Sequence, residues 1–154
     1  MSLAAPTLEP LCELLVEVGP ALDVGELPQG RRRVVPITGG VVQGRLQGRV
    51  LAGGADFQRV YEGGRIAELD ARYVLQLDDG SLVHVRNRAL RVTDAENAAR
   101  LLRGEAVDPA AVYFRCQPVL EASASAWRWL GERQFVGSGV REPARVRLAF
   151  FEVL

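Results

Sequence analysis

The sequence predicts a mainly β fold, an antiparallel closed or nearly closed barrel of about eight to ten strands with one short helix. Sixteen glycines separate short runs rich in valine and leucine, apolar and polar residues alternate within those runs, and one segment alone has helical spacing. We favour a barrel over a sandwich because closure removes exposed strand edges. A barrel of this size can hold side chains or one small ligand.

The first strand is expected over Leu11–Val18, because Leu14 and Val16 alternate with Glu13 and Glu17. The glutamates then face water while their neighbours face a core. Gly-Pro follows directly and ends the strand.

Two further strands are expected over Arg32–Thr38 and Val41–Leu51, with a break at Gly39-Gly40. Gly44 and Gly48 lie inside the second run. Glycines in such positions indicate bulges, sharp coiling or the close approach of another chain segment.

A hairpin over Leu69–Leu90 is the clearest local signal, because Asp79-Gly80 is a preferred pair for a two-residue turn. Asp78 then faces Ser81, and a shift of one residue would exchange the two faces. In this register one face carries Leu69, Ala71, Tyr73, Leu75, Leu77, Leu82, His84, Arg86, Arg88 and Leu90.

One helix is expected after Thr93, which with Glu96 has the spacing of a capping box, and it ends near Gly104. Later elements are expected as strands over 112–120, 133–140 and 145–153, with a short helical turn near 123–130. We find no repeat or linker and expect a single β-barrel domain over 1–154, with an ordered core of about 8–154.

Charge and composition exclude several classes of function. Nineteen basic residues balance nineteen acidic ones, so the basic excess of a nucleic-acid binder is missing. All nineteen are arginines, which excludes lysine-based covalent catalysis and suits the recognition of carboxylates. No apolar run is long enough to span a membrane and no signal peptide is visible, so we expect a cytoplasmic protein.

Metals and nucleotide cofactors are not expected either. Cys12 and Cys116 lie far apart and the chain has one histidine, which leaves no zinc-finger or multi-histidine ligand set. Neither a phosphate-binding loop nor a dinucleotide fingerprint occurs, and no serine has the context of a nucleophile.

Four segments together resemble a known family. They are Gly39-Gly40-Val41-Val42-Gln43-Gly44 with Gly48, Gly53-Gly54-Ala55-Asp56-Phe57, Asp70-Ala71-Arg72-Tyr73 running into Asp78-Asp79-Gly80, and Tyr113-Phe114-Arg115 followed by Trp129-Leu130 and Phe135-Val136-Gly137. In this order and spacing they resemble the domain-of-unknown-function family 3237, also called uncharacterised protein family 0311, from about Leu11 to Val153. The resemblance implies a β-barrel of lipocalin-like appearance with no established general activity.

Asp56 and His84 are the candidates for acid–base chemistry. Asp56 lies in a glycine-rich loop-like stretch, where its carboxylate acts as a general base or forms an Asx turn with its own backbone. His84 is the only histidine in the chain, and it serves as a proton shuttle or as a hydrogen-bonded core residue.

The candidates for ligand binding are Tyr73, Arg86, Arg115 and Trp129. An arginine inside a barrel needs an anion, either a ligand carboxylate or an internal partner, unless that end of the face opens to solvent. Arg115 is a carboxylate clamp or a structural salt-bridge partner, and Trp129 forms an aromatic wall or packs in the core.

These features favour a small-molecule site inside the barrel for an organic ligand that bears a carboxylate or carbonyl. Turnover would be cofactor-independent acid–base chemistry of the isomerase, dehydratase or cyclase type. The alternative is a non-catalytic structural or self-association module whose barrel is filled with side chains. Self-association is left open in either case.

Overall fold

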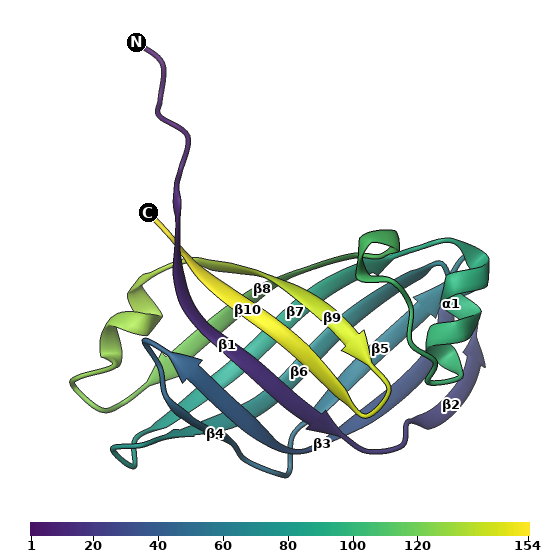
Figure 1. The fold of residues 1–154 in the computed structure, drawn as a ribbon, viewed down its shortest axis with the longest axis horizontal. Helices are drawn as coiled ribbons and strands as arrows, with labels where there is room; N and C mark the ends of the chain where they lie inside the picture. The colour runs from purple at the N-terminus through teal and green to yellow at the C-terminus, as the bar shows by residue number, and fades with distance from the viewer.

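The computed structural model describes all residues, 1–154, and shows one sheet of ten strands wrapped into a closed antiparallel barrel (Figure 1). The predicted fold class is confirmed. The strands are β1 Leu8–Val18, β2 Leu22–Leu27, β3 Gly30–Gly44, β4 Gly48–Val50, β5 Ala55–Tyr61, β6 Ile66–Leu77, β7 Leu82–Val92, β8 Tyr113–Ala122, β9 Phe135–Glu142 and β10 Arg145–Val153.

Strand β1 closes the barrel because it has a partner on each side. It pairs with β10, beginning at Leu8 opposite Val153, and with β3, where Leu14 lies opposite Val42. Strand β2 pairs with β3 alone and extends the sheet beyond the ring. Strand β2 is therefore the one strand with a single partner strand.

Strand β3 runs unbroken from Gly30 to Gly44, so the predicted break at Gly39-Gly40 was wrong. Gly40 has a φ of 145°, and a Cβ built on it would lie 2.1 Å from the carbonyl oxygen of Leu15 on β1. The absence of a Cβ at Gly40 lets β3 pass this close to its neighbour.

The hairpin of β6 and β7 differs from the predicted register by one residue. Leu77 N–H donates to the carbonyl of Ser81 at 2.9 Å, so the loop holds the three residues 78–80 instead of two. Gly80 has a φ of 87°, the left-handed conformation that ends such a loop. Tyr73 consequently faces Val85 rather than Arg86, and every β7 side chain lies on the opposite side from the one predicted.

Helix α1 spans Ala95–Leu102, and its N-cap is Asp94, whose Oδ1 accepts a hydrogen bond of 2.8 Å from the backbone N–H of Asn97. The predicted capping box at Thr93 was therefore wrong by one residue. The Thr93 hydroxyl instead donates to the carbonyl of Ala111 at 2.8 Å. Glycine follows the helix at position 104 with a φ of 77°, as expected.

The two ends of the barrel are closed differently (Figure 1). The short helix η2, Arg128–Glu132, lies at one end and buries Leu130 completely. Helix α1 lies at the other end, near the tip of the β9–β10 hairpin, together with η1, Pro109–Ala111. The core contains fully buried leucine, valine and phenylalanine side chains, among them Leu11, Leu14, Leu46, Leu75, Val83, Val85, Leu120, Leu130 and Phe150. Neither α1 nor any other helix is both apolar and long enough to cross a membrane.

Candidate functional site

Polar side chains gather inside the barrel on the strands nearest α1. On β5, Asp56 and Gln58 point inward, two residues apart. Asp56 lies opposite Ala71 of β6, and Ala71 lies opposite Asn87 of β7. The small alanine between the aspartate and the asparagine leaves space above the sheet.

That space is a cavity of about 50 Å³. It has room for roughly four water-sized groups at about 10–15 Å³ each. Its lining combines polar with apolar side chains: Val16, Val18, Val35, Ile37, Asp56, Gln58, Leu69, Ala71, Tyr73, Asn87, Ala89, Arg91, Phe114, Arg141, Val146 and Leu148. The barrel interior is thus filled with side chains around a small hollow whose lining is mostly apolar and includes a few polar groups.

Three buried polar atoms of this lining have no hydrogen-bond partner. They are Oδ1 of Asp56, the hydroxyl of Tyr73 and Oδ1 of Asn87, and they are the whole set of such side-chain atoms in the chain. A buried polar group without a partner costs about 1–3 kcal/mol. All three residues line this one cavity, and buried polar groups in folded proteins usually have a hydrogen-bond partner.

Burial raises the pKa of the Asp56 carboxyl, and a hydrogen bond from Gln58 opposes that shift. The bond runs from Gln58 Nε2 to Asp56 Oδ2 at 2.8 Å, which leaves Oδ1 free towards the cavity. A raised carboxyl pKa is a common feature of groups that exchange protons.

Tyr73 is 4% exposed, and burial raises the pKa of its hydroxyl well above the ordinary value of 10.0. The phenol therefore stays protonated and can donate a hydrogen bond to an oxygen in the cavity. It pairs with Val85 across the hairpin, which fixes its position on the interior face.

Four arginines line the cavity and the depression that adjoins it towards α1. The depression, of about 400 Å³, shares Gln58, Arg91 and Arg141 with the cavity and adds Arg33 and Arg103. Burial lowers the pKa of Arg91 to about 10, and the Asp56 carboxylate opposes the shift. At neutral pH this guanidinium remains charged.

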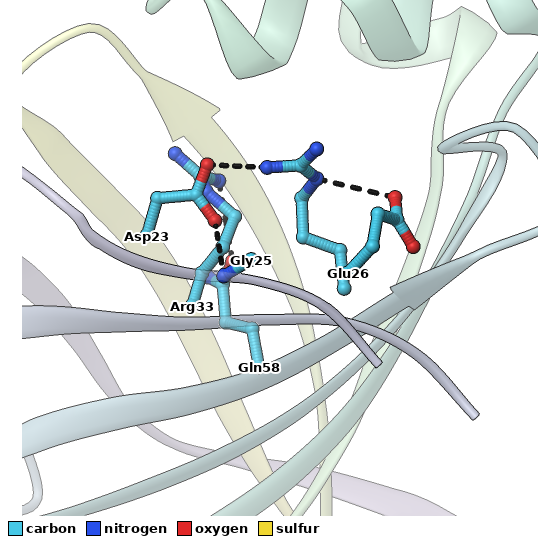
Figure 2. Close-up of polar contacts among 6 residues, drawn as sticks. Asp23, Gly25, Glu26, Arg33 and Gln58 are labelled. Carbon is cyan, nitrogen blue, oxygen red and sulfur yellow. Dashed lines mark hydrogen bonds and ion pairs between the residues drawn. The ribbon is translucent and has the colours of Figure 1, made fainter. Parts of the chain in front are cut away.

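The rim beside Arg33 belongs to β2 and β3 (Figure 2). Asp23 pairs with Arg31, which also contacts Glu26 at 3.3 Å, and Asp23 accepts a hydrogen bond of 3.0 Å from the backbone of Gly25. Arg33 reaches Gln58 at 3.4 Å and has no carboxylate within 4 Å. Burial lowers its pKa while the charge of Asp23 opposes the shift.

The structure brings Asp56 and Tyr73 into one cavity but places His84 elsewhere. His84 lies on the outer face of β7, exposed, with Nδ1 3.9 Å from Glu121. Arg86 lies on the same outer face and forms hydrogen bonds of 3.1 and 3.2 Å with Asp70. The predicted inward placement of both residues was wrong, because the three-residue loop exchanged the faces of the hairpin.

Arg115 and Trp129 also lie away from the cavity. The guanidinium of Arg115 stacks over Tyr113 on the outside of β8, 5.2 Å from the ring centroid. Trp129 packs against Phe135 at the η2 end, with Arg45 over its ring at 5.1 Å. The indole therefore combines core packing with a cation–π contact instead of forming a cavity wall.

A larger hollow, a surface groove of about 910 Å³ on the outside of the barrel, contains Arg86 and Arg115. Its charged side chains are exposed or half-buried, and Arg86 and Arg59 are paired with Asp70 and Glu68. Exposed ion pairs of this kind are weak and need no ligand. We therefore place the candidate site in the smaller interior cavity, where the unpartnered groups are.

The sequence did not indicate four of the site residues, which are Gln58, Arg91, Arg141 and Arg33. The predicted register placed Asn87 on the hairpin face opposite to that of Tyr73. The signal for two of them was the alternation in β7. Val83 and Val85 are apolar while His84, Arg86 and Arg88 are charged or polar, so Asn87 and Arg91 continue the apolar, inward series. No group of three or more His, Cys, Asp or Glu side chains in the chain could hold a metal ion.

The fold and site define a closed antiparallel β-barrel with a small, mostly apolar cavity at the α1 end into whose lining a few polar residues are set. Residues 6–153 match the family described as "Protein of unknown function (DUF3237)", and the chain belongs to this family. It is 39% identical over 152 residues to UPF0311 protein RPA1785 of Rhodopseudomonas palustris, covering 97% of this chain and 99% of that protein. It is 37% identical over 151 residues to UPF0311 protein blr7842 of Bradyrhizobium diazoefficiens, covering 97% and 99%.

Solved structures share the barrel. The crystal structure of RPA1785 superposes with a TM-score of 0.92 at 35% identity, over 99% of this chain and 100% of that one. A beta-barrel like protein from Acinetobacter baumannii gives 0.86 at 35% identity, over 99% of each chain. An enzyme from Penicillium herquei gives 0.74 at 19% identity, over 100% and 98%, a likeness of fold alone.

Proposed function

We propose that the barrel binds a small organic ligand bearing a carbonyl or carboxylate in the α1-end cavity, and that Asp56 exchanges a proton with it. The observation that carries this proposal is the convergence of three unpartnered buried atoms, from Asp56, Tyr73 and Asn87, on one hollow. Structural polar residues are paired in folded proteins, so a set of unpaired ones around a cavity is typical of a binding site.

Each of the three groups has a distinct chemical role. Oδ1 of Asp56 is free to accept a proton from a carbon or oxygen of the ligand, while Gln58 holds Oδ2 in place. The Tyr73 hydroxyl donates to the oxygen on which negative charge develops. Oδ1 of Asn87 accepts from a hydroxyl or amide of the ligand. One base and one oxyanion donor suffice for isomerisation, dehydration or cyclisation without a cofactor.

The test follows proton exchange in D₂O by ¹H NMR, with a panel of small ketones and 2-oxo acids. Loss of the signal of protons α to the carbonyl reports enolisation. Asp56→Asn should slow exchange by about 10²–10⁴-fold. Tyr73→Phe should slow it by about 10²–10³-fold, the cost of one oxyanion donor.

Asp70→Asn is the matched control, because Asp70 lies on the neighbouring strand β6 but faces outward and pairs with Arg86. It should exchange protons at the wild-type rate. Equal rates for Asp56→Asn and Asp70→Asn would overturn the catalytic part of the proposal. Native mass spectrometry of freshly purified protein tests the binding part by detecting a small molecule that is retained by the wild type and lost from Asp56→Asn.

A further inference from the structure

Arg91 is an unusual side chain for the interior of a barrel. It lies on β7 between Ala67 and Phe114, points inward, and is 8% exposed. Its guanidinium has no hydrogen-bond partner and no carboxylate within 4 Å anywhere in the chain. Burying a charge without a direct partner is costly, and the Asp56 carboxylate, which lines the same cavity but lies beyond 4 Å, offsets that cost only in part, so Arg91 can accept a further anion.

The surroundings of Arg91 supply more positive charge. Asp56 is the one carboxylate among the residues that line the cavity and its depression, and four arginines line them as well: Arg33, Arg91, Arg103 and Arg141. Arg103 is paired with Glu105 at 3.0 Å. Arg141 donates only to the backbone carbonyls of Glu142 and Arg145, at 2.7 and 3.2 Å. The residues that line the site therefore carry more positive than negative charge on the α1 side of the cavity.

We propose that Arg91, assisted by Arg141, anchors the carboxylate of a small organic acid, whose remainder extends between Asp56 and Tyr73. This inference rests on the proposed function and names its substrate class. A planar guanidinium matches a carboxylate with two parallel hydrogen bonds, which also fixes the orientation of the ligand.

The dimensions fit a short acid. The cavity of about 50 Å³ holds only a few heavy atoms, whereas the depression of about 400 Å³ outside it holds a larger group. Arg91 and Arg141 belong to both spaces and so mark the boundary between them. A carboxylate at that boundary leaves the reactive carbonyl or hydroxyl within reach of the unpartnered oxygens.

The test compares three acids, 2-oxobutanoate, succinate and benzoate, with their neutral amides and with inorganic phosphate, by isothermal titration calorimetry on the full chain. The carboxylates should bind the wild type about 10- to 100-fold more tightly than the amides. Arg91→Gln should lose that factor, and Arg91→Lys should recover part of it because the charge is kept. Arg88→Gln, an exposed arginine on the outer face of the same strand, should bind as the wild type does.

A stability measurement separates anion binding from a structural role. Without ligand, Arg91→Met should have a Tm equal to or above that of the wild type, because it removes an unpaired buried charge and keeps the aliphatic stem. A lower Tm for Arg91→Met would show that the arginine supports the fold and would overturn the inference.

The outcomes also separate this inference from the proposed function. If the amides bind as tightly as the acids and binding depends on Asp56, the proposed ligand-binding function stands. The inference that Arg91 anchors a carboxylate is then wrong. Phosphate bound in preference to every acid would likewise remove it. Failure of every acid and every amide to bind the wild type would overturn both.

Discussion

Gln58 donates a hydrogen bond of 2.8 Å to Oδ2 of Asp56, its neighbour two residues earlier on the inward face of β5. The contact holds one carboxylate oxygen and leaves the other, buried Oδ1, without a partner. Burial outweighs this bond, so the pKa of Asp56 is raised from its ordinary value of 3.8. The balance between these two effects makes the aspartate a measurable probe of the cavity.

Asp56→Asn should change how stability depends on pH. Because the folded pKa is raised, the folded wild type holds this proton more firmly than the unfolded chain does. Its free energy of unfolding therefore falls as the pH rises from about 3.8 through the higher folded value. The stability of Asp56→Asn relative to the wild type should rise over that window, measured by urea unfolding from about pH 3 to about pH 8.

Asp70→Asn provides a control of opposite sign. A hydrogen bond from Arg86 lowers the pKa of Asp70, so the wild type gains stability as the pH rises through the folded pKa of Asp70 towards its unfolded value. The variant should lose stability relative to the wild type over that range. If the stability of both variants, relative to the wild type, changes with pH in the same direction, the Asp56 carboxyl is as hydrated as the outward-facing carboxyl of Asp70.

His84→Ala should change the free energy of unfolding by no more than about 0.5 kcal/mol, because the imidazole lies exposed on the outer face. Val85→Ala, one residue on, removes a fully buried side chain and should cost about 2 kcal/mol or more. Chemical denaturation measures both. If His84→Ala instead costs more than Val85→Ala, the hairpin has the register predicted from the sequence, with His84 inside the barrel.

Gly80→Ala should cost about 1 kcal/mol, because the φ of 87° strains any residue with a Cβ while no atom lies within 4 Å of that Cβ. The cost is therefore one of backbone conformation alone. Gly131→Ala is the comparison, since its φ is ordinary and its nearest neighbour lies 3.9 Å away. Thermal unfolding should separate the two variants, and equal Tm values would argue against the three-residue loop.

Glu152→Gln should destabilise the η2 end by about 1–3 kcal/mol. The Glu152 carboxylate is 7% exposed and contacts Arg45 at 2.8 Å and Arg133 at 3.2 Å. Arg133 is 58% exposed, so Arg133→Gln should cost less than about 1 kcal/mol. A Glu152→Gln protein as stable as the wild type in urea would show that the two arginines are not held by this carboxylate.

Both cysteines should resist thiol reagents in the folded protein. Burial raises the pKa of Cys12 to about 12 and that of Cys116 to about 11, so almost no reactive thiolate exists at neutral pH. Titration with a chromogenic disulfide should detect no thiol in the native state and two after denaturation. Rapid reaction of either cysteine in native buffer would show that its strand opens locally.

The sequence was sufficient for the class of fold because alternation and glycine placement are local signals. The Leu8–Val18 strand has buried Leu14 and Val16 with exposed Glu13 and Glu17, as its pattern predicts. Register was harder, because Asp-Gly suits both two- and three-residue loops and a single residue decides which face points inward.

The candidate site could be predicted only in part for the same reason. Asp56 belongs to a recognisable segment and Tyr73 to the apolar series of β6, so both were named from the sequence. Arg91 and Arg141 come together from β7 and from β9 only when the barrel closes, and neither lies in a motif. Long-range pairing of this kind leaves no trace in local composition.

The seam between β1 and β10 has a consequence for how the protein acquires its structure. These strands are far apart in the sequence, and the ring closes only when β10 has been synthesised and pairs with β1. Bringing such distant segments together is entropically costly and slow. Until β10 pairs with β1, both strands expose unpaired backbone groups. Slow pairing of these two strands therefore gives partly folded chains time to associate with one another.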